Sequence, residues 1–399
     1  MSNSLLVLLD ELCRIRGFRK DKGGPGEQAI AKRVEQELRR FDWLTVVVEP
    51  VCDSRDNEMD GFYNVLAYDG APEDIEFLVV GHLDTVTPSP GWTVEEFTSV
   101  GGCYHALGAI DARGGIACCL DAIEQVGPTK GVGYLFYSDE EVLFAGMRYF
   151  VRRHPEIAPM FGLSVCGGPA SAHVGWRGCT EMEFLIRGVS GHASRPFEGV
   201  NVAEALSAVM LEVAKACMSA QTEMMTAANV AAMHVGSAAS DDFESFELGR
   251  HTAPPVKDVA NKIPNRGWAL LDVRPGGPEV SAAFIERVAR EALSRFNAGK
   301  PHRAEMRVHT NFEMPMYLAD DQIDWLVDLF DPVHGGVRSD SSKTGFLDTG
   351  LISAAHGTQF MCLAPAGGSA HGADEYVDIY SMAAYRDCMA QLLGRHRAP

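Results

Sequence analysis

The feature that most constrains this chain is an alternation of apolar, strand-like runs with amphipathic helical segments over residues 1–177. The runs "IEFLVVGH" and "GVGYLFYS" are continuously apolar, as strands buried on both faces are. "AIAKRVEQELRRF" carries apolar residues at helical spacing, and "GIACCLDAIEQV" also indicates a helix. This alternation predicts an α/β domain with a largely parallel sheet and helices on both faces. In such a sheet, functional side chains gather at the carboxyl ends of the strands.

The middle of the chain has a different order of elements. From "TEMEFLIRGV" to "AEMRVHTNF" the patterns indicate strand, helix, strand, strand, helix and strand, which is typical of a ferredoxin-like βαββαβ unit. We therefore expect a mixed α/β domain formed by residues 1–177 and 312–399 and interrupted by a smaller domain over residues 178–311. The polar, acidic stretch 236–258 is predicted to be a long loop, either a solvated insertion or a functional segment.

Composition excludes several classes of protein. The 399 residues are 46% hydrophobic and 22% charged, which is ordinary for a globular chain. A formal charge of −19 disfavours binding to nucleic acid or to anionic membranes. No apolar stretch approaches the roughly 20 residues that span a bilayer, and the early acids Asp10 and Glu11 argue against a signal peptide. Ten scattered cysteines without a C-x-x-C pair are typical of reduced thiols, so we expect a soluble, cytoplasmic protein.

Two early segments end in side chains that can bind a metal. In "FLVVGHLDTV", His82 and Asp84 follow a buried strand and lie on the same side of the chain. A carboxylate nearby can hold a metal-binding histidine in one tautomer, although a lone His82 is more typical of a structural, hydrogen-bonded histidine. In "HALGAIDARGG", Asp111 precedes a helix, and taken alone it is more typical of a helix cap.

Two later segments add further candidates. Asp139, Glu140 and Glu141 end the strand in "YLFYSDEE", where three like charges repel unless cations or solvent compensate, and a solvated first helical turn is the alternative. With a metal present, Glu141 would bind it and Glu140 would take a proton from water. His371 stands in the loop "APAGGSAHGADEYV", where simple exposure to solvent is the alternative. Because all four segments follow strands or strand-like runs of one domain, and carboxylate with imidazole suits zinc or manganese, we expect a metal site.

The segments "GHLDTV", "GAIDARGG", "SDEEV", "GVSGHASRPFEGVN", "NKIPNRGWALLDVRP" and "AHGADEYV" occur in this order along almost the whole chain. The series resembles the metal-dependent aminoacylase and carboxypeptidase family that includes acetylornithine deacetylase, succinyl-diaminopimelate desuccinylase and glutamate carboxypeptidase. The resemblance implies a two-zinc hydrolase. For this chain we expect one or two zinc ions, or cobalt or manganese in their place. The resemblance implies that His82 and His371 each bind one metal and that Asp111 bridges the two metals. It also implies that Glu141 binds the second metal, that Glu140 is the general acid/base, and that Asp84 orients His82.

The resemblance also implies that the domain over residues 178–311 is a lid and dimerisation domain. His192 in "GHASRP" would stabilise the oxyanion of a tetrahedral intermediate, often in the active site of the partner subunit. Asn261 and Arg274 would grip the carboxylate of the substrate, for which an arginine fork is well shaped. From the residues alone, a turn-forming Asn261 and a surface ion pair for Arg274 remain open.

The segment "LSVCGGPA" departs from the family pattern. Members of the family normally carry an acid just before the proline, as a ligand of the metal held by His82, and this chain has Gly168 there. One explanation is a single metal with three protein ligands and water, which is a normal arrangement for catalytic zinc. Those ligands would be Asp111, Glu141 and His371.

Two further explanations remain open. A substitute ligand is the second, either Cys166, two residues earlier on the same strand face, or the more distant His173. The third is that hydrolysis has been lost. We predict hydrolysis of an amide bond in an N-acyl amino acid or small peptide by a homodimer, with no nucleic-acid or membrane partner. The alternatives are a non-hydrolytic protein that binds a carboxylate ligand through Asn261 and Arg274, and acyl transfer or amide formation on the same scaffold.

Overall fold

The structure of the chain is a computed structural model, and it describes residues 3–166, 171–237, 247–249, 251, 253, 256 and 261–398. Gly168 and most of the predicted loop 236–258 therefore lie outside the described residues. The chain divides into two compact units. One comprises Met1–Gly175, Leu318–Asp340 and Asp348–Pro399, and the other Trp176–Tyr317 and Ser341–Leu347. The sequence patterns did not predict that residues 341–347 belong to the second unit.

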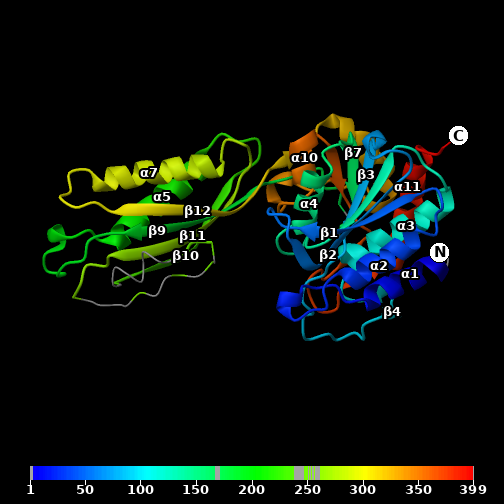
Figure 1. Ribbon diagram of the computed structural model, residues 1–399, viewed down its shortest axis with the longest axis horizontal. Helices are drawn as coiled ribbons and strands as arrows, with labels where there is room; N and C mark the ends of the chain where they lie inside the picture. Colours follow the sequence, from blue (N-terminus) through cyan, green and yellow to red (C-terminus); the bar gives the residue numbers. More distant parts are fainter. Residues whose placement is uncertain are drawn as a thin grey trace. The chain divides into compact units, whose positions relative to one another are not determined.

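The first unit is built on a six-stranded sheet in the order β1-β2-β6-β3-β7-β14 (Figure 1). Strands β6, β3, β7 and β14 run parallel, while β2 pairs antiparallel with both β1 and β6. The predicted mixed, largely parallel α/β fold is therefore confirmed. The strand bounds are β1 Thr45–Cys52, β2 Glu58–Tyr68, β3 Phe77–His82, β6 Val132–Tyr137, β7 Phe161–Ser164 and β14 Gln359–Cys362.

Helices cover both faces of this sheet (Figure 1). One face carries α1, α2, α3 and α11, and the other carries α4 and α10. Among the described residues, no helix combines the length and the apolar character needed to cross a bilayer. The helix bounds are α1 Asn3–Arg14, α2 Gln28–Leu38, α3 Gly114–Val126, α4 Ala145–Arg153, α8 Asp324–Leu329, α9 Asp331–His334, α10 Gly350–His356 and α11 Ile379–Gly394.

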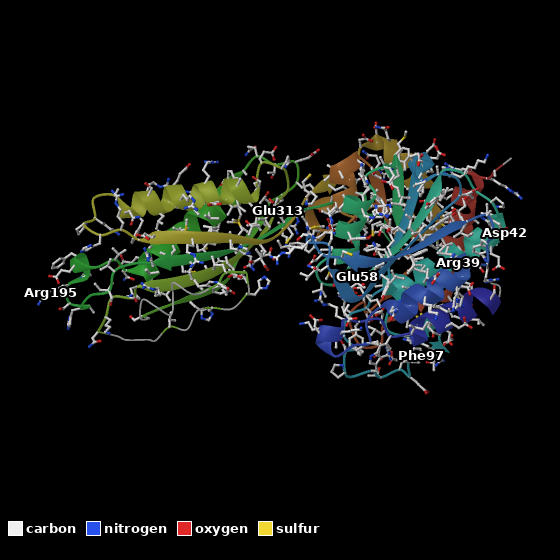
Figure 2. The ribbon with its side chains drawn as sticks, viewed as in Figure 1. Arg39, Asp42, Glu58, Phe97, Arg195 and Glu313 are labelled. Carbon is white, nitrogen blue, oxygen red and sulfur yellow. The ribbon has the colours of Figure 1, made fainter. Side chains whose placement is uncertain are left out.

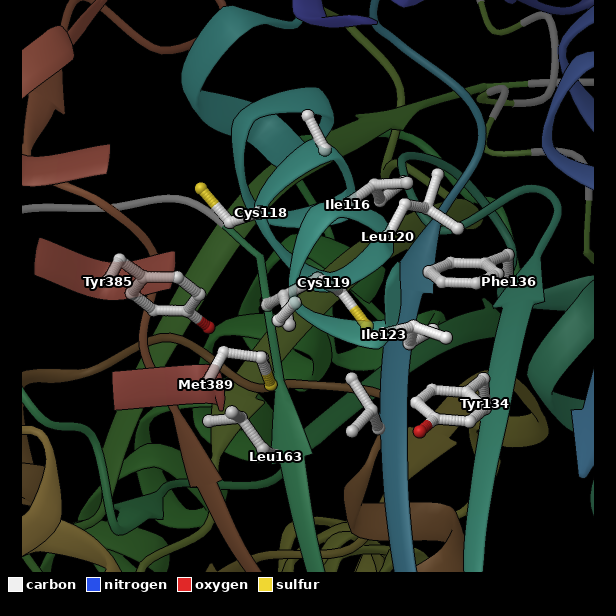
Figure 3. Packing of buried hydrophobic residues seen from close by; sticks show 14 of the residues in the cluster. Ile116, Cys118, Cys119, Leu120, Ile123, Tyr134, Phe136, Leu163, Tyr385 and Met389 are labelled. Carbon is white, nitrogen blue, oxygen red and sulfur yellow. The ribbon is translucent and has the colours of Figure 1, made fainter. Parts of the chain in front are cut away.

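Helix α3 forms the centre of the larger core. It packs between the sheet on one side and α1 and α11 on the other, which explains why its sequence is apolar nearly all round. Figure 3 shows Ile116 and Ile123 of α3 beside Phe136 of β6, with Tyr385 and Met389 of α11 nearby, and all five are buried. Burial of this apolar surface is the main source of stability for the unit.

A second, small sheet lies near the start of α3. Its strands are antiparallel and follow the order β15-β16-β5-β4. Because β16 pairs with β5, the segment that carries His371 lies against the segment that leads to Asp111. The strand bounds are β4 Thr98–Val100, β5 Cys103–His105, β15 Gly367–Gly368 and β16 Tyr376–Asp378.

The second unit contains a four-stranded antiparallel sheet in the order β10-β11-β9-β12. Along the chain its elements follow the order β9, α5, β10, β11, α7, β12, and both helices pack on one face of the sheet. The role of this unit as a lid and dimerisation domain stays a prediction. The bounds are β9 Cys179–Arg187, α5 Val202–Ser219, β10 Ala227–Gly236, β11 Arg266–Arg274, α7 Ala282–Asn297 and β12 Glu305–Met314.

Gly115 allows α3 to approach the backbone of β7, which gives a test of this packing. A Cβ at Gly115 would lie 2.2 Å from the carbonyl oxygen of Val165. We expect Gly115→Ala to lower the free energy of unfolding by about 1–3 kcal/mol, the usual cost of overpacking, as measured by urea denaturation. Gly394→Ala is the matched control, because a Cβ there has nothing within 4 Å. Equal unfolding midpoints for the two variants would contradict the close approach.

Candidate metal centre

The carboxyl ends of β3 and β6 carry three of the predicted residues. The two strands are parallel neighbours, and His82 pairs with Tyr137, the last residue of β6. His82 is fully buried, and Glu140 and Glu141 follow Tyr137 after a short turn. Parallel strands end at the same edge of a sheet, so the imidazole and the two carboxylates are brought together by the topology.

Asp84 joins these two strand ends. Its carboxylate accepts the backbone N–H groups of Glu140 and Glu141, each at 3.0 Å. The Nδ1 atom of His82 lies 3.2 Å from the carbonyl oxygen of Asp84 and 3.4 Å from its Oδ1. A partner on Nδ1 fixes the ring and leaves Nε2 available as a ligand atom. Asp84 is thus placed to orient both the His82 ring and the turn that carries the two glutamates.

Asp111 lies between the two histidines, in the helical turn η3 (Ala109–Arg113). Its Oδ1 is 2.9 Å from Nε2 of His82, and its Oδ2 is 3.2 Å from Nε2 of His371. The peptide bond between Asp111 and Ala112 is cis. Glu141 approaches the same ring of His371, with Oε2 3.0 Å from Nε2. Each oxygen of Asp111 therefore faces a different imidazole, as a carboxylate shared by two metal sites would.

The donor atoms form two groups within which all atoms lie within 4.8 Å of one another. One group is His82, Glu140 and Glu141, and the other is Asp111, Glu141 and His371. Imidazole nitrogen and carboxylate oxygen are ligands that zinc, cobalt and manganese accept. The sequence prediction that Asp111, Glu141 and His371 share one ion is compatible with these distances.

Because the carboxylates of this cluster are buried, their negative charge is only partly compensated. Burial raises the pKa of Glu140 well above its usual value, and the negative charges of Asp348 and Glu141 raise it further. Burial likewise raises the pKa of Glu141. Acids gathered out of water favour either protonation or a bound cation. The donor set therefore fits a divalent metal ion.

The two histidines respond in the complementary direction. Hydrogen bonds to Asp111 and Glu141 raise the pKa of His371 to about 10. Burial acts to lower the pKa of His82, but the Cys166 thiol and Asp111 raise it overall, well above its usual value. Both shifts favour the protonated, cationic ring when no metal is bound. A divalent ion would take over that role, since a ring must be neutral to bind it.

Glu375 is a functional candidate that the sequence patterns did not single out. It is buried, and its Oε1 accepts the backbone N–H groups of Ile110 at 3.1 Å and Asp111 at 3.4 Å. Burial raises the pKa of Glu375 to about 7. Its carboxylate holds the turn that presents Asp111. The available signal in the sequence was an acid close behind His371 in "AHGADEYV".

Asp348 is a second buried acid at this edge of the sheet. Its Oδ1 accepts the hydroxyl of Tyr137 at 3.0 Å, and burial raises its pKa to about 7. No hydrogen-bond partner within the described part of the chain reaches its Oδ2. It stands alone among apolar and small residues in "FLDTGL", so the sequence carried no sign of it.

The two predicted substitute ligands differ in position. Cys166 is buried beside His82; burial raises the pKa of its thiol, and His82 opposes that shift. His173 instead lies 3.3 Å from the Ser171 hydroxyl through its Nε2, and burial lowers its pKa. Neither residue belongs to the two donor groups found among the described residues. Because Gly168 lies outside those residues, the explanations for its missing side chain stay open.

The remaining predicted residues belong to the second unit. His192 is exposed, and its Nδ1 accepts the backbone N–H and the hydroxyl of Ser194 at 3.2 and 2.8 Å. A neutral ring in that state carries its proton on Nε2, where it can donate. Asn261 is next to His192, because its carbonyl accepts the N–H of Ala193 at 3.0 Å.

Arg274 lies at the other end of the second unit. Its Nη2 donates to Asp272 at 2.8 Å, and its guanidinium stacks 4.8 Å from the centre of the Phe346 ring. Asn261 precedes the first residue of β11 and Arg274 is its last, so about 25 Å of strand separates them. Figure 2 shows these two ends of the unit through its labels Arg195 and Glu313. Within one chain, therefore, the predicted pairing of Asn261 with Arg274 on one carboxylate does not form.

The fold and the site together define the class of this protein. It is an α/β protein with a candidate metal centre at the carboxyl ends of its parallel strands. The chain belongs to the peptidase family M20/M25/M40, whose model matches residues 78–395. The resemblance deduced from the sequence motifs is thereby confirmed.

Individual relatives agree with this family. The chain is 34% identical over 273 residues to acetylornithine deacetylase of Yersinia pseudotuberculosis, a match that covers 65% of this chain and 64% of that protein, less than two thirds of its length. Aminopeptidase PepT from Bacillus cereus has a TM-score of 0.70 at 17% identity, covering 99% of this chain and 98% of that one. The Bacillus subtilis YXEP protein, a dinuclear metal-binding peptidase of the M20 family, has a TM-score of 0.64 at 13% identity, covering 98% and 97%. The structural likeness shows the fold alone.

The contact between Glu375 and the Asp111 turn can be tested by metal affinity. Glu375→Ala removes the acceptor of two N–H groups, and we expect zinc to bind about 10–100-fold more weakly, the usual cost of losing a group that orients a ligand. Glu375→Gln keeps one oxygen and should lose less. Competition with a chromogenic chelator measures the affinity, and circular dichroism checks folding. Unchanged affinity in a folded Glu375→Ala protein would contradict the orienting role.

Proposed function

We propose that the chain is a metal-dependent hydrolase that cleaves the amide bond of an N-acyl amino acid or small peptide. The observation that carries the proposal is the position of Asp111, with one oxygen directed at His82 and the other at His371, beside the buried Glu140 and Glu141. Membership of the M20/M25/M40 family supports metal dependence. The similarity to acetylornithine deacetylase supports an N-acyl amino acid as the substrate class.

His82, Asp111, Glu141 and His371 are the residues that would hold the metal. When bound, a divalent ion supplies Lewis-acid polarisation of the substrate carbonyl and lowers the pKa of water. Glu140 belongs to the first donor group but is assigned to proton transfer: it removes a proton from the attacking water and returns it to the leaving amine. Burial keeps its carboxylate dry and its proton affinity high, which suits a group that must accept and then release a proton.

The second unit would supply the substrate-binding residues. His192 can donate from Nε2 to the oxyanion that develops on the carbonyl oxygen. Arg274 offers a fork for the substrate carboxylate, with Asn261 as a further donor. Since Arg274 lies about 25 Å along β11 from the His192 and Asn261 end, one substrate would contact both ends only across two copies of the chain. This separation supports a homodimer as part of the proposal.

The outer surface of the second unit supports self-association. Among the described residues, strand β10 is at the edge of its sheet and pairs only with β11, which leaves its outward backbone groups to another strand. Helix α5 exposes Leu211 at 72% and Met218 at 57% of their surface, and Met225 follows it at 63%. Exposed large apolar side chains and an edge strand are both features of interfaces between copies.

Glu140→Gln tests the assigned base. The amide cannot accept a proton, so we expect hydrolysis of N-acetyl amino acids to fall by roughly 10²–10⁴-fold while the zinc content stays unchanged. Release of free amine measures activity after loading with zinc, cobalt or manganese. Glu58→Gln, at an exposed position labelled in Figure 2, is the matched control and should keep full activity. A Glu140→Gln protein as active as the wild type would overturn the assignment, and tight ligand binding without hydrolysis by the wild type would favour the carboxylate-binding alternative.

Mixing two inactive variants tests the dimer. Glu140→Gln lacks the base, and His192→Ala lacks the oxyanion donor. If His192 acts in the partner subunit, a heterodimer has one intact site, and random exchange should restore about a quarter of wild-type activity. In the control, His192→Ala mixed with the Glu140→Gln/His192→Ala double variant should restore nothing. Light scattering must also show a dimer; a monomer, or mixed variants that stay inactive, would overturn the shared site.

A further inference from the structure

Asp139 is the first of three consecutive acids after β6, and the proposed mechanism uses only the other two. It is buried, and its φ of 64° lies in the left-handed region, which aspartate and asparagine tolerate better than most other residues. Its backbone N–H donates to Oε2 of Glu27 at 3.1 Å, and its carbonyl oxygen accepts the N–H of Phe144 at 2.7 Å. The conformation of Asp139 therefore sets the direction in which the chain enters Glu140 and Glu141.

Arg19 compensates the buried charge of Asp139. Its Nη1 donates to Oδ1 of Asp139 at 2.8 Å, and the side chains of the two residues are 14% and 0% exposed. Its Nε and Nη2 donate to the exposed Asp21 at 2.9 and 2.8 Å, and its guanidinium carbon lies 5.5 Å from the centre of the Phe62 ring. A carboxylate removed from water needs such a partner to offset its lost hydration. The cation of Arg19 thus stabilises the buried position of Asp139.

The segment that carries Arg19 is fixed on both sides of this residue. The carbonyl oxygen of Gly17 accepts the N–H of Thr85, just after β3, at 3.0 Å. Further along, the N–H of Glu27 donates to the carbonyl oxygen of Gly61 in β2 at 2.9 Å, and the Glu27 side chain is fully buried. Because the backbone around Arg19 is held, its ion pair costs less conformational entropy than one between freely moving surface side chains.

We infer that Arg19 is a positioning residue of the candidate hydrolytic site, because its ion pair with Asp139 holds the turn that carries Glu140 and Glu141. This inference rests on the proposed metal-dependent function. Asp84 binds the backbone N–H groups of the two glutamates themselves, whereas Arg19 fixes the residue before them. Arg19 therefore acts through Asp139 and not on the reacting atoms. A shift of about 1 Å in a catalytic group can cost about 100-fold in rate, so the ion pair bears directly on turnover.

Arg33 provides a matched control. Its side chain is 20% exposed, close to the value for Arg19, and it also pairs with two acids. They are Glu11 and Glu37, each at 2.6 Å, and neither belongs to the donor groups of the candidate metal centre. Arg33→Ala therefore removes an arginine of similar burial and similar pairing and leaves the turn at Asp139 unchanged.

Steady-state kinetics and zinc competition on the full-length protein test the inference. At saturating zinc, we expect Arg19→Ala to lower kcat for a panel of N-acetyl amino acids about 10–100-fold and to leave KM little changed, since the loss is in the placement of Glu140. Competition with a chromogenic chelator should show zinc bound about 10-fold more weakly, because Glu141 is on the same turn. Arg19→Lys should recover most of both, since one ammonium N–H can replace the single bond to Asp139. Arg33→Ala should match the wild type in both.

A double variant keeps the test valid if Arg19→Ala unfolds. Removing Arg19 alone leaves a buried charge unpaired, which is strongly destabilising, whereas Arg19→Ala/Asp139→Asn leaves none. Asparagine also tolerates the left-handed conformation. Asp139→Asn should itself lower kcat, because a neutral amide binds Arg19 more weakly, and the double variant should then show no further loss. Wild-type kcat in Asp139→Asn, or a clear further loss in the double variant, would overturn the inference.

The outcomes separate this inference from the proposed function. An Arg19→Ala protein that is folded by circular dichroism and has the kcat and zinc affinity of the wild type would overturn the inference alone, and so would an equal loss in Arg33→Ala. A wild type that binds zinc but hydrolyses no N-acyl amino acid or small peptide would overturn the proposed function, and the zinc affinities of the same variants would then decide whether Arg19 positions the turn. A wild type that neither binds zinc nor hydrolyses these substrates would overturn both.

Discussion

Buried negative charge at the carboxyl edge of the central sheet is the constraint on which the site depends. The acids there are satisfied in two ways. Asp84 and Glu375 each accept two backbone N–H groups, which fixes the turns of the Glu140–Glu141 pair and of Asp111. The carboxylates on those turns instead face imidazoles. Acids bonded to the backbone thus position the cluster, and acids that face imidazoles are available to a metal ion.

This division of roles links the fold to metal binding. Buried acids without full compensation cost stability, and a ligand that binds only the folded chain returns stability in proportion to its affinity and concentration. The raised pKa values express the same imbalance, because burial disfavours the charged form of Glu141 and the neighbouring carboxylates favour the charged form of His371. Metal binding and proton release are therefore coupled at this edge of the sheet.

Much of this architecture was predictable from the sequence, because the decisive signals are local. "IEFLVVGH" is apolar throughout since β3 is buried on both faces, and a strand of that kind must deliver His82 to its end. The contribution of Glu375 was less predictable, since it depends on which segment pairs with which, here β16 with β5. The sequence identified Asn261 and Arg274 as candidate carboxylate-binding residues by their type. Their separation along β11 is known only from their positions on the sheet.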